Sequence, residues 1–241
     1  MKKTLMITLL SSAALMLFAT SADAKTFDDQ TDVGVSFKSD DPTVIGDNQP
    51  FKDNLSLVWK PSAFQFGEQT AVGNSATFSN TVEGNQYLVV NDDRADDALT
   101  GWKLTAKMSE LKSASGAKTL ASKLTFNLGT AQAYRITDDP TKLNDKNDYI
   151  VNKPDTEGVL TELEDAGIKL GDGASKSIEL VAGDTTSKTI LGKETANGTK
   201  GGVATLIKDT KLVVADAEKD NAAGESFTGT VTWTLDDLVQ N

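Results

Sequence analysis

The sequence predicts an all-β protein, an antiparallel β-sandwich or barrel-like domain with long loops and one short helix. Apolar side chains recur at every second position in many short segments, a period that places one face of a strand on a core. Thr and Val are abundant in these segments, and 19 glycines with many Asn and Asp residues supply turns between them. Several short strands separated by such turns are typical of sandwiches and barrels.

The first 24 residues have the features of a secretory signal peptide. Lys2 and Lys3 give a positive start, a mostly apolar run covers residues 4–18, and Ala22 and Ala24 mark a cleavage site directly after this segment. The apolar run is shorter than the ~20 residues that a membrane-spanning helix needs. We therefore expect export with removal of residues 1–24 and no membrane insertion. The last residues show no apolar stop-transfer tail, so we also expect no covalent sorting to the wall.

Residues 25–54 are expected to form an acidic, extended arm. Seven Asp residues in this stretch repel one another, and little apolar surface is available to bury. Val33, Val35 and Phe37 alternate with small or polar residues, which indicates one short edge strand.

The remaining residues, 55–241, are expected to form one β domain. Its alternating or apolar segments cover residues 55–59, 87–90, 102–108, 124–128, 178–180, 189–191, 206–207, 212–215 and 227–235. In the first of them, Leu55, Leu57 and Trp59 are expected to share one face of a strand. A helical period over residues 156–166, with a stop signal at Gly167, predicts the one helix.

The composition excludes several functional classes. The chain has no Cys and no His, so it has no disulfide framework, no Cys nucleophile, no His-based metal site and no Ser-His-Asp triad. Its formal net charge is −11, and without residues 1–24 it carries 22 basic and 34 acidic residues, a net charge of −12. We therefore expect no nucleic-acid partner, because phosphate binding requires a basic surface.

The acidic residues do not indicate a metal site or an active site. Pairs or runs of Asp occur at residues 92–93, 96–97, 138–139 and 145–148. The last run lacks the Gly and the distal Glu of an EF-hand loop, so we interpret all four as solvated turn residues. With 34 acids in the chain, some pair of carboxylates at catalytic spacing is inevitable and has no weight. We expect no catalytic residue, no metal and no cofactor.

Two tripeptides point to a known family. Trp102-Lys103-Leu104 lies near the middle of the chain, and Trp233-Thr234-Leu235 lies close to its end. This pair of Trp-x-Leu motifs resembles the WxL domain of Gram-positive bacterial surface proteins. Residues 61–67, which run from a Pro to a Phe-Gly pair, resemble the opening of such domains.

The segment before the first motif also resembles the family. An apolar run at residues 87–90 precedes Asp93-Arg94, like the strand and supporting Asp-x-Arg-type turn of WxL domains. Residues 95–100 depart from the pattern, because the family commonly has a Gly after this Arg. The resemblance covers about residues 55–241. It implies a noncovalent attachment module at the cell wall, with peptidoglycan or another wall glycan as ligand and a membrane-anchored protein of the same surface complex as partner.

The four motif residues allow two interpretations. Trp and Leu two positions apart lie on the same face of a strand, so Trp102, Leu104, Trp233 and Leu235 can pack in the core. Alternatively, the two indoles stack on wall glycan.

The sequence thus predicts a secreted, non-enzymatic surface protein that attaches noncovalently to the Gram-positive wall and serves as a scaffold or binding subunit. One alternative is an adhesin or fibre subunit that assembles by strand addition through residues 25–54. Another is a carbohydrate-processing enzyme. Because Gram-positive walls are anionic, a chain at −12 must be held by short-range contacts or by a basic partner.

Overall fold

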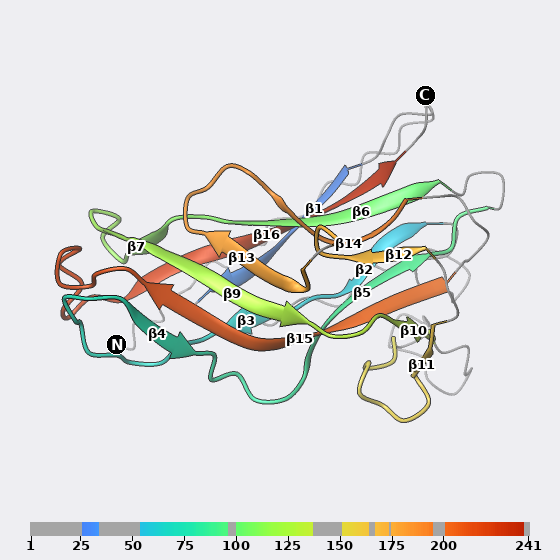
Figure 1. Ribbon diagram of the computed structural model, residues 1–241, viewed down its shortest axis with the longest axis horizontal. Coiled ribbons are helices and arrows are strands. Elements are labelled where there is room, and N and C mark those ends of the chain that lie inside the picture. The colour runs from blue at the N-terminus through green and yellow to red at the C-terminus, as the bar shows by residue number, and fades with distance from the viewer. Residues whose placement is uncertain are drawn as a thin grey trace, which may run out of the picture.

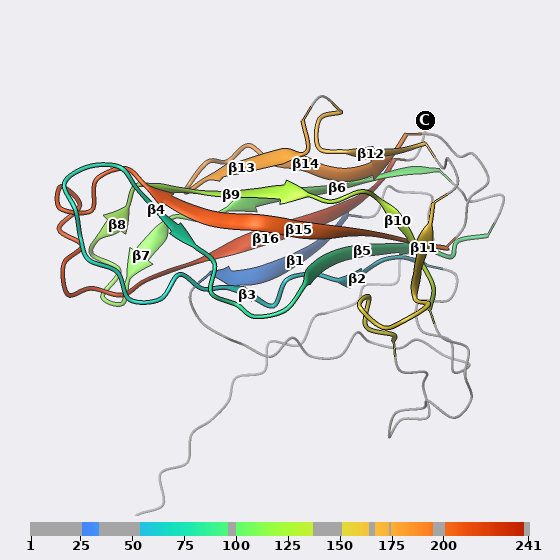
Figure 2. The ribbon, with the colours of Figure 1, turned by 60° about the horizontal axis from the view of Figure 1, so that its bottom comes forward.

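The computed structural model describes residues 26–33, 54–95, 100–136, 151–163, 167–173, 175–194 and 201–238. Over these ranges the chain forms strands and no helix, which confirms the all-β prediction. The strands build two sheets that pack as a sandwich and run along the long axis of the molecule (Figure 1, Figure 2).

The first sheet contains both Trp-x-Leu segments. Its strands are β1 (Thr26–Val33), β3 (Ala63–Phe64), β6 (Gly101–Met108), β7 (Leu111–Ser113), β8 (Thr119–Leu120), β12 (Ile168–Leu170), β14 (Lys188–Lys193) and β16 (Phe227–Leu238). The main path runs β12-β14-β6-β16-β1-β3, and β7 joins β16 to β8 at one end. Neighbours are antiparallel except for β1 and β3, which are parallel.

The second sheet is organised around one long strand, β15. Its strands are β2 (Leu55–Trp59), β4 (Ala76–Ser79), β5 (Gln86–Asp92), β9 (Ser122–Leu128), β10 (Gln132–Tyr134), β11 (Leu160–Glu162), β13 (Ser177–Val181) and β15 (Gly201–Val214). The main path runs β11-β10-β15-β5-β2, with β4 and β9 also paired to β15 and β13 paired to β9.

The hydrophobic core lies between the two sheets. Its fully buried side chains come from the inward-facing positions of both layers and include Phe64, Leu88, Trp102, Leu104, Phe126, Ile190, Trp233 and Leu235. Burial of each large apolar side chain contributes ~1.5–3 kcal/mol relative to exposure. The sandwich is therefore held together chiefly by the faces that the alternating pattern predicted.

The acidic N-terminal region contributes a strand to the first sheet. β1 pairs antiparallel with β16 over its whole length, from Thr26 opposite Asp236 to Val33 opposite Gly229. It also pairs with β3 through its last two residues. The strand in this region thus ends at Val33, where the sequence had indicated one to begin, and residues 34–53 lie outside the described ranges. The division of the chain after residue 54 stays a prediction.

Trp59 does not share a face with Leu55 and Leu57, so that expectation is wrong. The pairing of β2 with β5 shifts register between Leu57 and Trp59, which is a β-bulge. One extra residue reverses the alternation of the strand beyond it. Trp59 consequently packs with Val89 in a small apolar cluster that is separate from the main core.

The predicted helix over residues 156–166 does not form in its described part. Residues 154–159 form turns, and β11 follows and pairs with β10. Gly158 adopts φ 77°, a left-handed conformation that interrupts a helix. Val159 and Leu160 instead cover the separate apolar cluster beside Trp59. Residues 164–166 lie outside the described ranges.

Candidate functional site

The two Trp-x-Leu motifs lie next to each other in the centre of the first sheet. β6 carries the first motif and β16 the second, and their antiparallel register places Leu104 opposite Leu235. Trp233 lies opposite Ala106, whose small side chain leaves room for the indole. Trp102 is 1% exposed, and the other three motif residues are 0% exposed.

Trp233 also connects the two sheets. Its ring centroid lies 6.4 Å from that of Phe126, with the planes tilted by 50°. Phe126 belongs to β9 of the second sheet, and it stacks in turn on Phe64 of β3 at 6.4 Å and 16°. Aromatic pairs at this spacing contribute ~0.5–1.5 kcal/mol beyond the burial of their area. The second motif therefore anchors an aromatic row that crosses the core.

This burial favours the core interpretation of the motifs. An indole that is 0% or 1% exposed offers no face on which a sugar ring can stack. The motif residues thus help to build the core of the domain.

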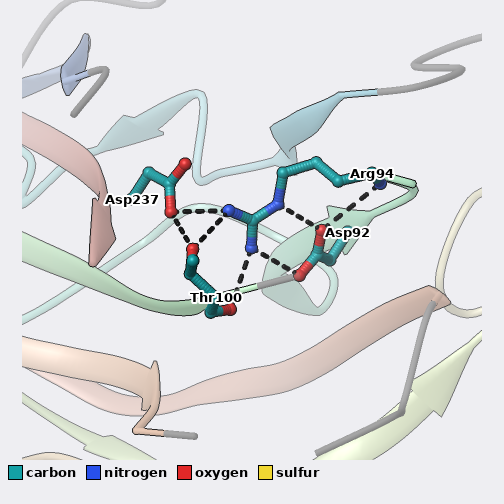
Figure 3. A network of polar contacts seen from close by, with 4 residues as sticks. All are labelled: Asp92, Arg94, Thr100 and Asp237. Carbon is teal, nitrogen blue, oxygen red and sulfur yellow. Dashed lines mark hydrogen bonds and ion pairs between the residues drawn. The ribbon is translucent and has the colours of Figure 1, made fainter. Parts of the chain in front are cut away.

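A polar cluster closes one end of the motif strands. We call Asp92, Arg94, Thr100 and Asp237 the Arg94 cluster (Figure 3). Nε and Nη2 of Arg94 donate to the two carboxylate oxygens of Asp92, each at 2.8 Å. Nη1 donates to Oδ1 of Asp237 at 2.5 Å and to Oγ1 of Thr100 at 2.8 Å. Nη2 also donates to the carbonyl oxygen of Thr100 at 3.0 Å, and the Thr100 hydroxyl donates to Asp237.

The cluster joins segments that are far apart in the sequence. Asp92 ends β5 of the second sheet, Thr100 directly precedes β6, and Asp237 lies near the end of β16. The guanidinium is planar and presents its donors as a fork, which suits the bidentate contact with Asp92. The Arg94 cluster therefore fixes the two sheets to each other beside the first Trp.

The cluster is charged and buried. Arg94 is 7% exposed and Asp92 is 2% exposed. Burial by itself lowers the pKa of Arg94, but the hydrogen bonds to Asp92 and Asp237 outweigh it, so the pKa is raised and the guanidinium stays protonated. Lys193 of β14 is 2% exposed and lies opposite Trp102 of β6 in the sheet. It is close enough to Asp92 and Arg94 for their charges to affect its pKa. Burial lowers the pKa of Lys193, Asp92 opposes that shift, and Arg94 adds to it.

Gly101 allows β14 to approach β6 beside this cluster. A Cβ atom at Gly101 would lie 2.5 Å from the carbonyl oxygen of Lys193 and 3.0 Å from that of Glu194. Both neighbours are backbone atoms, which cannot move aside as the end of a side chain can. Only glycine fits at this point of the strand.

The sequence located only part of this site. The structure places Arg94 at the centre of the cluster, but its partner is Asp92. Asp93 is half-buried, and its backbone N–H donates to the carbonyl oxygen of Asn54 at 3.0 Å. The interpretation of Asp92 as a solvated turn residue is wrong. Asp237 and Lys193 were missed, although Asp237 continues the inward-facing positions of Trp233 and Leu235, and an acid at such a position is itself a signal.

The other polar clusters of the sequence add no site. Among the described residues no group of His, Cys, Asp and Glu is arranged to hold a metal ion. The Asp pairs and runs at residues 96–97, 138–139 and 145–148 lie outside the described ranges. In the described part of the chain no helix has the length and apolarity to cross a membrane.

The fold and the paired motif strands define an all-β module whose signature residues build its core. The model of the WxL family, described as a surface cell wall-binding domain, matches residues 28–238. The chain therefore belongs to the WxL domain family and is a wall-binding protein of the cell surface. The match begins within β1 and ends at the last residue of β16. Comparison with curated proteins and with solved structures found no match.

Truncation of the central indole should destabilise the whole domain. We expect Trp233→Ala to lower the free energy of unfolding by ~3–5 kcal/mol, because it opens a cavity between the sheets and removes the contact with Phe126. Thr228→Ala, an exposed position on the same strand, should change it by at most ~0.5 kcal/mol. Urea unfolding followed by circular dichroism measures both. Equal effects of the two substitutions would contradict the core role of Trp233.

Removal of the buried cation should cost far more than removal of an exposed one. We expect Arg94→Met to destabilise the protein by ~3–5 kcal/mol, because Asp92 would keep its buried charge without its bidentate partner. The matched control is Lys112→Met, since the Lys112–Glu110 ion pair has side chains that are 54% and 52% exposed. The control should change stability by at most ~0.5 kcal/mol. A small effect of Arg94→Met in the same urea titration would show that the cluster does not hold the sheets together.

Proposed function

We propose that this protein is a noncovalent scaffold or binding subunit at the Gram-positive surface, held on wall glycan by its folded WxL domain and partnered by a membrane-anchored protein of the same surface complex. The observation that carries the proposal is the family match, which spans the sandwich from β1 to β16. Because the motif side chains are buried, the ligand contacts the outer surface that this core supports.

The proposed role is binding without catalysis. The motif residues are committed to packing, and the charged side chains of the Arg94 cluster are committed to one another. The alternative is a carbohydrate-processing enzyme, and an assay with purified wall distinguishes it directly from a binding protein. Release of soluble sugar from the wall by the purified protein would support that alternative instead.

The net charge restricts how attachment works. At −12 the exported chain is repelled by an anionic wall over about one Debye length, ~8 Å at physiological salt. Attachment therefore depends on short-range contacts that outweigh this repulsion, or on a basic partner.

Added salt should strengthen retention on purified wall. We expect the fraction of protein that sediments with protein-free sacculi to rise between ~0.05 M and ~0.5 M NaCl, because salt screens the repulsion and leaves short-range contacts in place. The measurement is a pull-down quantified by absorbance, with the same samples assayed for released sugar. If salt strips the protein from the sacculi, attraction between opposite charges holds it and the proposed mode of attachment is wrong.

A second candidate, assembly by strand addition, is favoured by the place of β1 in the sheet. All eight residues of β1 pair with β16, whereas only Asp32 and Val33 pair with β3. The strand is also acidic, with three Asp residues among its eight. A strand such as β1, which pairs mainly along one edge, can be supplied by a neighbouring copy of the protein. The β1 strand of that copy would then form the same backbone pairs with β16.

Engineered cysteines test strand exchange cleanly, because the chain has none of its own. Gln30 lies opposite Thr232 in the register of β1 and β16. If copies exchange β1, mixing the single variants Gln30→Cys and Thr232→Cys under mild oxidation should give a disulfide-linked heterodimer. The control mixes Gln30→Cys with Thr228→Cys, a position of β16 beyond the reach of β1. A heterodimer yield no greater than the control would eliminate this candidate.

A further inference from the structure

The third indole of the chain, Trp59, lies outside the main core. Trp102 and Trp233 are 1% and 0% exposed, whereas Trp59 is partly exposed. It lies on β2, at one end of the strand order of the second sheet. The β-bulge after Leu57 turns its side chain away from the main core. Contact with a ligand, which burial denies to the two motif indoles, is therefore open to Trp59.

A second aromatic side chain lies beside Trp59 on the outer face of this sheet. Leu88 and Val90 of β5 point into the main core, so Val89 between them and Tyr87 point to the opposite side. Trp59 lies opposite Val89, and Tyr87 is two positions further along β5. Positions related in this way are roughly 7–8 Å apart, close enough for two rings to form one surface. We call the partly exposed side chains of Trp59 and Tyr87 the outer aromatic pair.

A hydrogen bond fixes the indole along the sheet. Nε1 of Trp59 donates to the hydroxyl of Tyr134 at 3.3 Å, and that hydroxyl donates to the carbonyl oxygen of Asn152 at 2.7 Å. Tyr134 belongs to β10, and both β15 and β5 lie between β10 and β2. Three strand spacings are about 14 Å, so the two side chains meet only if both extend along the sheet.

The sheet beneath these side chains is adapted to a close ring. A Cβ atom at Gly202 of β15 would lie 2.5 Å from Cδ1 of Tyr134, so only glycine lets that ring approach the strand. Ala204 of β15 and Val89 of β5 are opposite each other and belong to the same small cluster as Trp59. The exposed part of the indole is thus held in one position before a ligand arrives, and binding needs little reorganisation.

The outer aromatic pair suits an uncharged sugar ring. The face of an aromatic ring is electron-rich, and it attracts the weakly positive C–H groups on one side of a pyranose. Such a contact needs no opposite charge, which suits a chain at −12 that must be held on an anionic wall by short-range contacts. The matched family is described as surface cell wall-binding, so wall glycan is the sugar-bearing partner that the protein meets.

We propose that the outer aromatic pair is a stacking subsite for an uncharged N-acetylhexosamine ring of wall glycan. The inference rests on the proposed attachment to wall glycan and assigns part of that attachment to the outer face of the second sheet. Trp59 makes the main contact, because its indole is fixed by Tyr134, and Tyr87 extends the surface.

Titration of the full protein with tetra-N-acetylchitotetraose, an uncharged chain of N-acetylglucosamine units, tests the subsite. Trp59 is the partly exposed indole among three, so acrylamide should quench mainly its fluorescence. We expect saturating tetramer to shift the emission to shorter wavelength and to protect it from acrylamide. The Kd should be the same at ~0.05 M and ~0.5 M NaCl, because the ligand carries no charge.

Two variants identify the side chains involved. Trp59→Leu and Tyr87→Leu keep an apolar side chain in the small cluster and remove the flat ring. By calorimetry, Trp59→Leu should raise the Kd about tenfold and Tyr87→Leu about threefold, as loss of one aromatic contact predicts. The matched control is Phe78→Leu, a partly exposed aromatic position of β4 that packs against the main core, and it should leave the Kd unchanged. Melting temperatures show that each variant is folded.

The possible outcomes separate the subsite from the general role. Absence of saturable binding, unchanged quenching at saturation, or an unchanged Kd in both Trp59→Leu and Tyr87→Leu would overturn the subsite. If sacculi still retain the wild-type protein in that case, wall attachment stands and uses another surface. If sacculi do not retain it, the proposed function fails, and the tetramer titration alone decides whether the outer aromatic pair binds sugar.

Discussion

The antiparallel pairing of β6 with β16 is the contact on which the rest of the structure depends. It brings the middle of the chain to its C-terminal region, sets Leu104 opposite Leu235 and buries both motif indoles on one face. β14 adds to the free edge of β6, and β1 adds to the free edge of β16, so the first sheet grows outward from this pair. Trp233 then reaches Phe126 of the opposite sheet. A family signature that looks like a binding motif is in this fold the centre of a core.

The Arg94 cluster complements that apolar contact at one end of the sandwich. Buried ion pairs lose much of their Coulomb attraction to desolvation, so their net contribution to stability is small, whereas the loss of one partner is costly. Arg94 has two carboxylate partners that come from different sheets, Asp92 and Asp237. Such an arrangement penalises any packing of the sheets that would leave a charge unpaired. The core supplies most of the stabilising free energy, and the cluster favours one relative position of the two layers.

The sequence predicted the features that depend on the local pattern of residues. It missed the features that depend on pairing between strands far apart in the chain. Alternation placed the strands around both motifs and the faces they bury, because a period of two acts within a single strand. It failed at Trp59, where one bulge reverses the face, and over residues 156–163, where Gly158 turns the chain. Arg94 was found through its family context, but Asp237 lies 143 positions further along the chain, and only the register of β16 brings it to Arg94.

The most direct test of whether Trp233 is a structural residue or a ligand contact is the wall binding of a conservative variant. Trp233→Phe keeps an aromatic ring at the centre of the core but removes the indole, so its melting temperature and its retention on sacculi should be measured on the same preparation. If Trp233 acts only through the fold, the folded fraction of this variant should bind sacculi as tightly as the wild-type protein. A variant that melts like the wild type and no longer binds would show that the indole itself meets the wall, and that the burial seen here is not the state that binds.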